Sequence, residues 1–344
     1  MDLTAILHAA QQQFASDVHM DAASSSVYVR SAGRLVLLNG FQSSPQALHD
    51  WLWQRLNEAQ RIVLGMQRQL DFSYFDVNLA LRTRITAYFS LHGLSLAIRL
   101  LPSQVPTLAE LGAPAFLSQL SPFSHGLVLI TGPTGSGKST TLASTLAHMN
   151  HNYAAHVVTL EDPIEFVHEQ GKSLFHQSQK SQHFDHYADA LNDCLRHDPD
   201  VIVVGELRDL ASIEMALRAA ETGHLVLATL HSASATNATT RLIDVFDESN
   251  KSFIRHVLAS VLIGVVAQRL VASAPNASEQ GRVAIFETLI ANPAVRNLIK
   301  ENKETQLSNL MQTQAQQGMF TFAQHYQKLL DAGRVIEPMP NWLS

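Results

Sequence analysis

The segment from Gly132 to Ser139 reads Gly-Pro-Thr-Gly-Ser-Gly-Lys-Ser and fits the pattern G-x-x-x-x-G-K-[S/T]. It follows an apolar run, Gly126 to Ile130, typical of a buried strand, and precedes a helix-compatible run, Thr140 to Met149. Glycines between a strand and a helix let the loop N–H groups and the helix N-terminus surround a phosphate. This context predicts a phosphate-binding loop at the end of a strand in an α/β sheet.

The residue types inside the loop indicate which ligand it binds. In such loops the lysine, here Lys138, reaches the β- and γ-phosphates of a nucleotide, and the following hydroxyl, Ser139, ligates Mg²⁺. The sequence therefore predicts ATP and Mg²⁺ as ligands. The nucleotide-binding residues that we expect are Gly132, Thr134, Gly135, Ser136, Gly137, Lys138, Ser139 and Thr140.

Further apolar runs after the loop indicate the architecture around it. Val157 to Leu160, Val201 to Val204 and Leu225 to Leu230 are short buried-strand candidates, each followed by a loop or helical pattern. Strands that alternate with helices predict a mostly parallel sheet covered by helices. After about Asn250 the pattern is mainly helical.

Acidic residues follow two of these strands. The strand Val201 to Val204 ends in Gly205-Glu206, and a carboxylate at this edge would lie beside the phosphate loop and could orient water. We expect Glu206 to be catalytic, although Gly205 stands where many P-loop strands carry an Asp. After the strand Val157 to Leu160, the carboxylates that could assist catalysis or position Mg²⁺ are Glu161, Asp162 and Glu165; an acidic strand end is also commonly a solvated turn.

Two histidines bracket the strand Leu225 to Leu230. His224 and His231 are seven residues apart, so they point to opposite faces of an extended strand and do not ligate one metal together. His231 lies at the strand end beside the expected site, where it could sense the γ-phosphate. A packed or surface histidine is the alternative.

The first hundred residues read differently from the rest. A helical period at Leu3 to Phe14 and several strand-like runs predict a small α+β domain. These runs are Val27 to Val29, Leu35 to Leu38, Ile85 to Leu91 and Leu94 to Leu101. Pro102 to Thr107 carries two prolines and no apolar period, so it predicts a linker at residues 102–107 that permits a hinge. We thus expect one domain at 1–101 and a second at 108–344, the latter ending in a helical part.

Composition limits the possible partners. The net charge is −6 over 344 residues and no Lys or Arg cluster is present, which disfavours nucleic acid as a partner. No apolar stretch approaches the length of a membrane span and the start has no signal-peptide pattern, so we expect a cytoplasmic protein. Cys194 is the only cysteine, which excludes a cysteine-rich zinc site within the chain.

Four segments together resemble the type II/IV secretion ATPase superfamily, and specifically its PilT-like retraction ATPases of type IV pili. The loop is similar to the family's Walker A motif. In addition to these four, a fifth segment, Pro293 to Glu301, is similar to the AIRNLIRE segment linked with retraction there, with Val295 and Lys300 departing from it. The other matching segments are the Asp box at Thr159 to Phe166, the Walker B segment from Asp198 to Asp209 with the family's Gly-Glu variant, and the His box from Ala220 to His231.

The resemblance implies more than the residues alone predict. It implies an N-terminal PAS-like domain, a RecA-like P-loop NTPase domain and a ring-shaped homo-hexamer that powers pilus retraction, as in twitching motility. It implies that arginines of the N-terminal domain complete the ATP site, and Arg84 and Arg99 align with those positions. It also implies a cytoplasmic motor, peripheral at the inner membrane, that acts on a pilus platform protein there, possibly together with a paralogous pilus ATPase.

Three other functions remain open at this stage. One is a pilus extension or type II secretion ATPase without its four-cysteine zinc module, although a single Cys194 favours the retraction branch. Another is a nonhydrolytic accessory subunit of a retraction motor. The last is a DNA-translocating ATPase, which the acidic balance disfavours.

Overall fold

The computed structural model describes residues 2–22, 24–31, 33–101, 104–275, 281–336 and 339–340. The chain forms two compact units, Met1–Gln104 and Val105–Ser344. Of the expected linker at 102–107, Pro102 and Ser103 lie outside the described residues. Within the described part of the chain, no helix combines the length and the apolarity needed to cross a bilayer.

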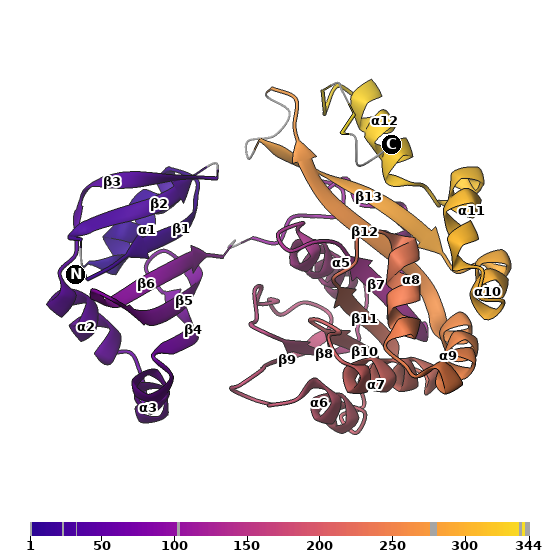
Figure 1. The fold of residues 1–344 in the computed structure, drawn as a ribbon, viewed down its shortest axis with the longest axis horizontal. Helices are drawn as coiled ribbons and strands as arrows, with labels where there is room; N and C mark the ends of the chain where they lie inside the picture. The colour runs from indigo at the N-terminus through magenta and orange to yellow at the C-terminus, as the bar shows by residue number, and fades with distance from the viewer. Residues whose placement is uncertain are drawn as a thin grey trace. The chain divides into compact units, whose positions relative to one another are not determined.

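The N-terminal unit is an antiparallel sheet with three helices among its described residues (Figure 1). The strand order is β3-β2-β1-β6-β5-β4. The core contains the apolar faces of the sheet and helices. The elements are α1 (Leu3–Gln12), β1 (Ala15–Met20), β2 (Ser26–Ser31), β3 (Arg34–Gln42), α2 (Pro45–Trp53), α3 (Glu58–Gln67), β4 (Gln69–Asp76), β5 (Leu81–Ser90) and β6 (Gly93–Leu100).

Local sequence explains how these helices begin. Pro45 is the first residue of α2, where its missing N–H costs nothing, and the Ser44 side chain caps that helix. A capping box of Asn57 and Gln60 starts α3. The small α+β domain expected from the sequence is therefore present, with two strands, β1 and β4, that the pattern did not predict.

The larger unit is built on a sheet of order β13-β12-β7-β11-β10-β8-β9. Its pairs are parallel except for β12 with β13. Its strands are β7 (Gly126–Thr131), β8 (His156–Glu161), β9 (Leu174–Gln179), β10 (Val201–Val204), β11 (Leu225–Leu230), β12 (Leu262–Ala272) and β13 (Arg282–Ile290). The four strands expected from apolar runs are β7, β8, β10 and β11.

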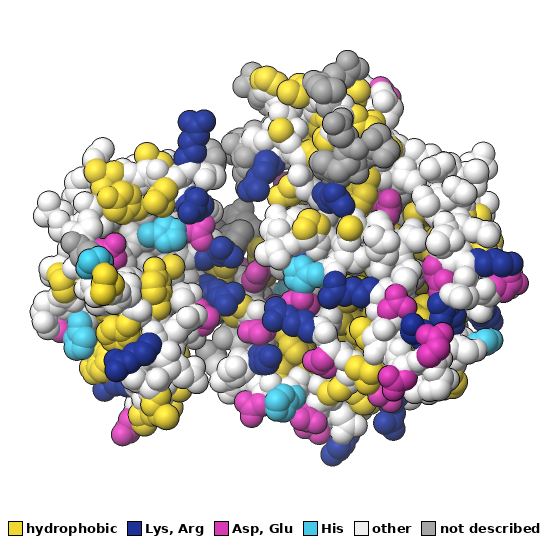
Figure 2. Space-filling model, viewed as in Figure 1, with side chains coloured by type: hydrophobic (Ala, Val, Ile, Leu, Met, Phe, Trp, Pro, Cys, Tyr) yellow, Lys and Arg dark blue, Asp and Glu magenta, His cyan; other side chains and the backbone are white. Residues whose placement is uncertain are grey.

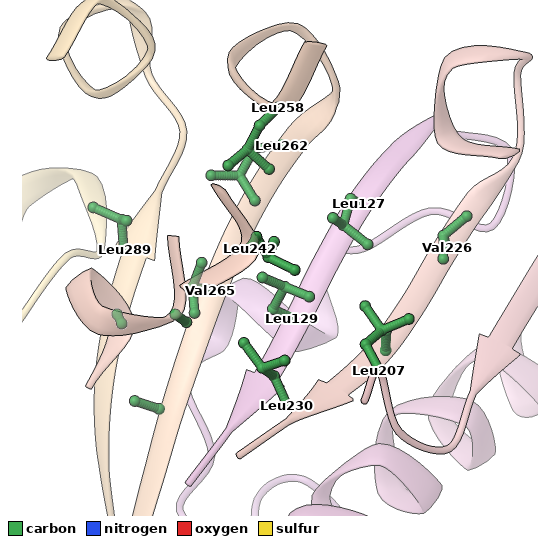
Figure 3. Packing of buried hydrophobic residues seen from close by; sticks show 14 of the residues in the cluster. Leu127, Leu129, Leu207, Val226, Leu230, Leu242, Leu258, Leu262, Val265 and Leu289 are labelled. Atoms are coloured by element: carbon green, nitrogen blue, oxygen red, sulfur yellow. The ribbon is translucent and has the colours of Figure 1, made fainter. Parts of the chain in front are cut away.

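Helices cover this sheet on both faces (Figure 1), so every residue of the central strands β7, β10 and β11 is buried, and nearly all of them are apolar. Leu127 and Leu129 of β7 pack into one cluster, whereas Val128 and Ile130 pack into the other. Figure 3 shows Leu129 of the first cluster with Leu230, Leu242 and Val265. The helices are α4 (Ala115–Ser118), α5 (Lys138–Asn152), α6 (Tyr187–Cys194), α7 (Leu210–Glu221), α8 (Ala235–Asp244), α9 (Glu248–Val261), α10 (Pro293–Lys300), α11 (Leu307–Thr313) and α12 (Phe322–Asp331), with short 3₁₀ turns η1 (Glu304–Gln306) and η2 (Ala315–Gln317).

The expectation of a mainly helical chain after about Asn250 is wrong for residues 262–272 and 282–290, which form the long strands β12 and β13. Helix α9 ends at Val261 and β12 begins at Leu262, so no proline or glycine turn separates them. An apolar run buried on both faces has no period that distinguishes a strand from a helix. The helical expectation holds for α9, which continues to Val261, and for the described residues from Pro293 onward, in α10 to α12.

We expect Gly126→Ala to lower the free energy of unfolding by about 1–3 kcal/mol. Gly126 has a φ of +136°, and a Cβ there would lie 2.4 Å from the Val261 carbonyl oxygen. Chemical denaturation followed by circular dichroism measures the change. In the control Gly65→Ala, the added methyl meets nothing within 4 Å inside α3. Because alanine favours helices over glycine, this control should be neutral or slightly stabilising. A Gly126→Ala protein as stable as wild type would contradict the packing described.

Candidate active site

The phosphate loop connects β7 to α5 and has the backbone expected of an anion cradle. Gly132, Gly135 and Gly137 have φ values of +154°, +77° and +87°, which favour glycine. Gly137 caps α5 without a side-chain hydrogen bond, so the first N–H groups of the helix remain available to an anion. The loop thus presents backbone donors at the positive end of a helix.

Two serines of the loop differ in their surroundings. Ser136 is buried, and its hydroxyl has no hydrogen-bond partner among the described residues. Ser139 is partly exposed in the first turn of α5. Because buried hydroxyls in native proteins are almost always paired, the Ser136 oxygen fits a site that receives a polar ligand. Thr134 and Gly135 are exposed at the tip of the loop.

Lys138 lies over the loop. Its Nζ donates to the carbonyl oxygens of Gly132 at 2.9 Å and Pro133 at 3.0 Å. Burial lowers the pKa of Lys138, and the carboxylates of Glu206 and Glu165 partly oppose that shift. An ammonium that burial has stripped of water gains most from an anionic partner such as a phosphate.

His231 connects Lys138 to Glu206. Its Nε2 lies 3.1 Å from Glu206 Oε1, and its Nδ1 lies 3.5 Å from Lys138 Nζ. An ammonium only donates and a carboxylate only accepts, so these partners assign the proton of a neutral His231 to Nε2. Arg208 Nη2 approaches the other oxygen of Glu206 at 2.6 Å. Lys138, His231, Glu206 and Arg208 thus contact one another in succession. The sequence patterns did not single out Arg208.

Close packing around position 205 leaves little space for a side chain, which explains why glycine rather than Asp precedes Glu206. A Cβ at this position would lie 3.1 Å from the Leu160 carbonyl oxygen, 3.2 Å from Glu161 Cα and 3.4 Å from the Tyr187 hydroxyl. These contacts are tighter than ordinary van der Waals packing. The end of β10 is therefore pressed against the end of β8, which holds Glu206 close to the acids after β8.

The acids at the end of β8 and just after it have separate environments. Glu161 Oε1 accepts hydrogen bonds from Thr159 at 2.7 Å and from Gln177 at 3.1 Å, and burial raises its pKa. Asp162 is exposed, with Lys180 4.0 Å away. Of the acids expected after β8, Glu165 is the one whose charge acts on Lys138. Among the residues that the structure describes, no three His, Cys, Asp or Glu side chains could hold a metal ion together.

Arg84 and Arg99 lie in the N-terminal unit and are described there by themselves. They are direct partners across β5 and β6, and Asp17 of β1 is the direct partner of Arg99 on its other side. Arg99 Nε lies 3.0 Å from Asp17 Oδ1, and Arg84 Nη2 lies 3.5 Å from Asp71 Oδ2. Both guanidinium groups remain more than a third exposed and line one small surface cavity with Asp17.

His224 is at the opposite end of β11 from His231, where its Nδ1 lies 3.1 Å from the Ala219 carbonyl oxygen. It is not among the side chains that link Lys138 to Arg208. Figure 2 shows basic side chains beside acidic ones on the visible face of the larger unit.

Sequence reasoning missed Arg208 and also Gln268 of β12, which packs against the phosphate loop. Arg208 could have been noticed because it follows Glu206 by two residues at the same strand end. Gln268 carried no such signal, because its strand was not predicted.

Comparison with known proteins gives the family. The family model described as type II/IV secretion system protein matches residues 1–337. A protein of Escherichia coli named uncharacterized protein YggR is 46% identical over 84% of this chain and 86% of its own length. The type IV pilus retraction ATPase PilT of Pseudomonas aeruginosa is 40% identical over 93% and 92%.

A solved structure of the pilus retraction motor PilT with bound ADP is similar over 100% of this chain and 99% of that chain. Its TM-score is 0.88 at 36% identity. The match includes the RecA-like nucleotide-binding fold and the small domain before it. The chain therefore belongs to the type II/IV secretion system protein family and is one of its ATPases.

Proposed function

We propose that this chain is the ATP-hydrolysing subunit of a motor that powers retraction of a type IV pilus. The observation that carries the proposal is the bridge from Lys138 through His231 to Glu206 at the mouth of the phosphate loop. This bridge joins the cation that binds the phosphates to a carboxylate that can act on water. The names of the relatives, a pilus retraction ATPase and a pilus retraction motor, support the physiological task.

Each residue of the site has a role in this proposal. The loop N–H groups and Lys138 bind the β- and γ-phosphates, and His231 reports the γ-phosphate to Glu206. Glu206 orients or deprotonates the attacking water once it exchanges its contact with Arg208 or His231 for one with water. Glu161, at the end of the neighbouring strand β8, assists Glu206 in catalysis.

Mg²⁺ would be held mainly by Ser139 and the nucleotide oxygens, with Glu161 and Asp162 as candidates to act through waters. This arrangement is supported by Ser139, a partly exposed hydroxyl in the first turn of α5 directly after Lys138. When bound, the ion neutralises charge on the phosphates.

We further propose that the site is completed in a homo-hexamer by Arg84 and Arg99 of a neighbouring subunit. Both guanidinium groups are partly exposed and pair with carboxylates of their own unit, so they remain available to a phosphate. The motor would work at the cytoplasmic side of the inner membrane on a pilus platform protein, possibly with a paralogous pilus ATPase.

The segment that resembles the retraction motif forms α10. Val295 and Ile299 of this helix are buried, and Arg296 donates to backbone carbonyls at the end of α9, one of them Ser260 at 2.6 Å. Its exposed residues, including Lys300, are the ones we propose to act on a partner.

The proposal predicts that Mg-dependent ATP hydrolysis per subunit rises with protein concentration, because sites shared between subunits form only on assembly. Hydrolysis by the purified chain is measured over a dilution series. A constant rate per subunit down to concentrations at which the protein is monomeric would contradict the shared site. ATP binding without hydrolysis at any concentration would favour a nonhydrolytic accessory subunit.

Deleting the gene in its own organism tests the direction of the motor. Loss of a retraction motor leaves cells with surplus pili, whereas loss of an extension motor leaves them without pili. Bald cells would therefore overturn the retraction assignment and favour the extension ATPase.

A further inference from the structure

Gln268 is a buried polar residue in an otherwise apolar part of β12. It is 2% exposed, and the preceding residues Val265, Val266 and Ala267 are fully buried. Burying an amide costs free energy unless the amide is hydrogen-bonded, so a side chain of this kind needs a specific partner. That partner is on the helix that begins at the phosphate loop.

The partner is Thr141, in the first turn of α5. Thr141 is fully buried, and its hydroxyl donates to Gln268 Oε1 at 2.6 Å. The backbone N–H of Thr141 in turn donates to the Gly137 carbonyl oxygen at 3.0 Å. Gln268 is thus tied through one residue to the end of the loop where α5 begins.

Gln268 also packs directly against both fixed glycines of the loop pattern. A Cβ at Gly132 would lie 2.3 Å from the Gln268 carbonyl oxygen, and a Cβ at Gly137 would lie 2.8 Å from its Nε2. The first approach is by backbone, which cannot move aside within a central strand. One residue of β12 therefore limits the space at the beginning and at the end of the loop.

We propose that Gln268 is a positioning residue for nucleotide binding, which holds the phosphate loop in the curvature that places its N–H groups around the β-phosphate. The amide is suited to this because Oε1 accepts from Thr141 while Nε2 leaves an uncharged donor beside Gly137. A carboxylate of the same size would keep the acceptor and bring a negative charge next to a bound phosphate. The inference rests on the proposed function only in taking the ligand of the loop as ATP or ADP.

ADP affinity of the full-length protein, measured by calorimetry, tests this role. We expect Gln268→Met, which is close in volume, to weaken ADP binding at least about tenfold. Gln268→Glu should weaken it further through charge repulsion. Thr141→Val should weaken binding in the same direction, and the double variant Thr141→Val with Gln268→Met should be no weaker than the weaker single variant, because both remove one interaction.

Two further measurements separate positioning from a general loss of stability. Val271→Ala removes buried methyl groups from the same strand and should lower the melting temperature without changing ADP affinity. Amide hydrogen exchange in the nucleotide-free Gln268→Met protein should rise in residues 132–141 and stay unchanged in β11. ADP binding by Gln268→Met at wild-type affinity would overturn the proposal.

These outcomes do not depend on the motor function, because ADP binding requires neither hydrolysis nor a pilus. A wild-type chain that binds ADP but never hydrolyses ATP would overturn the proposed function and leave this inference standing. If the wild-type chain hydrolyses ATP but its Gln268→Met variant binds ADP with wild-type affinity, this inference would be overturned and the proposed function would stand.

Discussion

Replacing Glu206 by Gln is expected to reduce Mg-dependent ATP hydrolysis by about 10²- to 10⁴-fold, the usual contribution of a general base. The amide keeps the size of the side chain and an acceptor for His231 or Arg208, so the strand end should not collapse. It cannot take a proton from water. Affinity for ADP should stay within a few-fold of wild type, because the loop and Lys138 are unchanged.

Glu214→Gln is the matched control. Glu214 is an exposed acid on α7, and removing its charge tests whether a change of charge in this unit alone affects turnover. Steady-state rates of the three proteins at saturating ATP give the comparison. If Glu206→Gln hydrolysed ATP within about threefold of wild type, Glu206 would not be the base.

Removing the arginines of the N-terminal unit should have an effect of similar size. An arginine that stabilises the transition state of phosphoryl transfer contributes about 10³- to 10⁵-fold in rate. We therefore expect Arg84→Ala and Arg99→Ala each to lose most hydrolysis while ATP still binds the intact loop. Arg30→Ala is a control on the same sheet, since its exposed guanidinium bonds the Gly33 carbonyl in its own hairpin.

A mixing experiment separates a shared site from damage within one subunit. Arg84→Ala protein retains Glu206, and Glu206→Gln protein retains Arg84. If the arginine acts on the neighbouring subunit, rings assembled from both proteins contain interfaces with every required group, and hydrolysis should return. Mixtures as inactive as their components would show that Arg84 does not act between subunits.

The sequence predicted the centre of the site because its signals are local. The loop pattern around Lys138 is contiguous, and the strands before Glu206 and His231 are short apolar runs that end at the functional residue. The rule that ligands bind at the carboxyl ends of parallel strands then brings these residues together. The structure places His231 in contact with both Lys138 and Glu206.

The remaining features depend on partners distant in the sequence. Gln268 meets the loop only because β12 pairs with β7, and this pairing brings residue 267 beside residue 131. In the N-terminal unit, β1 carries Ser16, Asp17 and His19 among its six residues, so it becomes a strand through its pairing with β2 and β6. The position of Arg208, two residues after Glu206, could be read from the sequence, but its contact with Glu206 Oε2 depends on how the two side chains are oriented.

The direct pairing of Arg84 with Arg99 across β5 and β6 has a mechanical consequence. Both residues are anchored within antiparallel strands of the same sheet, and Asp17 on β1 extends the row. Neither guanidinium group can be carried away by the motion of a single loop, as it could if it stood on a flexible tip. If both arginines act on a neighbouring nucleotide as proposed, their backbones would approach it together as parts of one sheet. The two charges would then arrive in step rather than in succession.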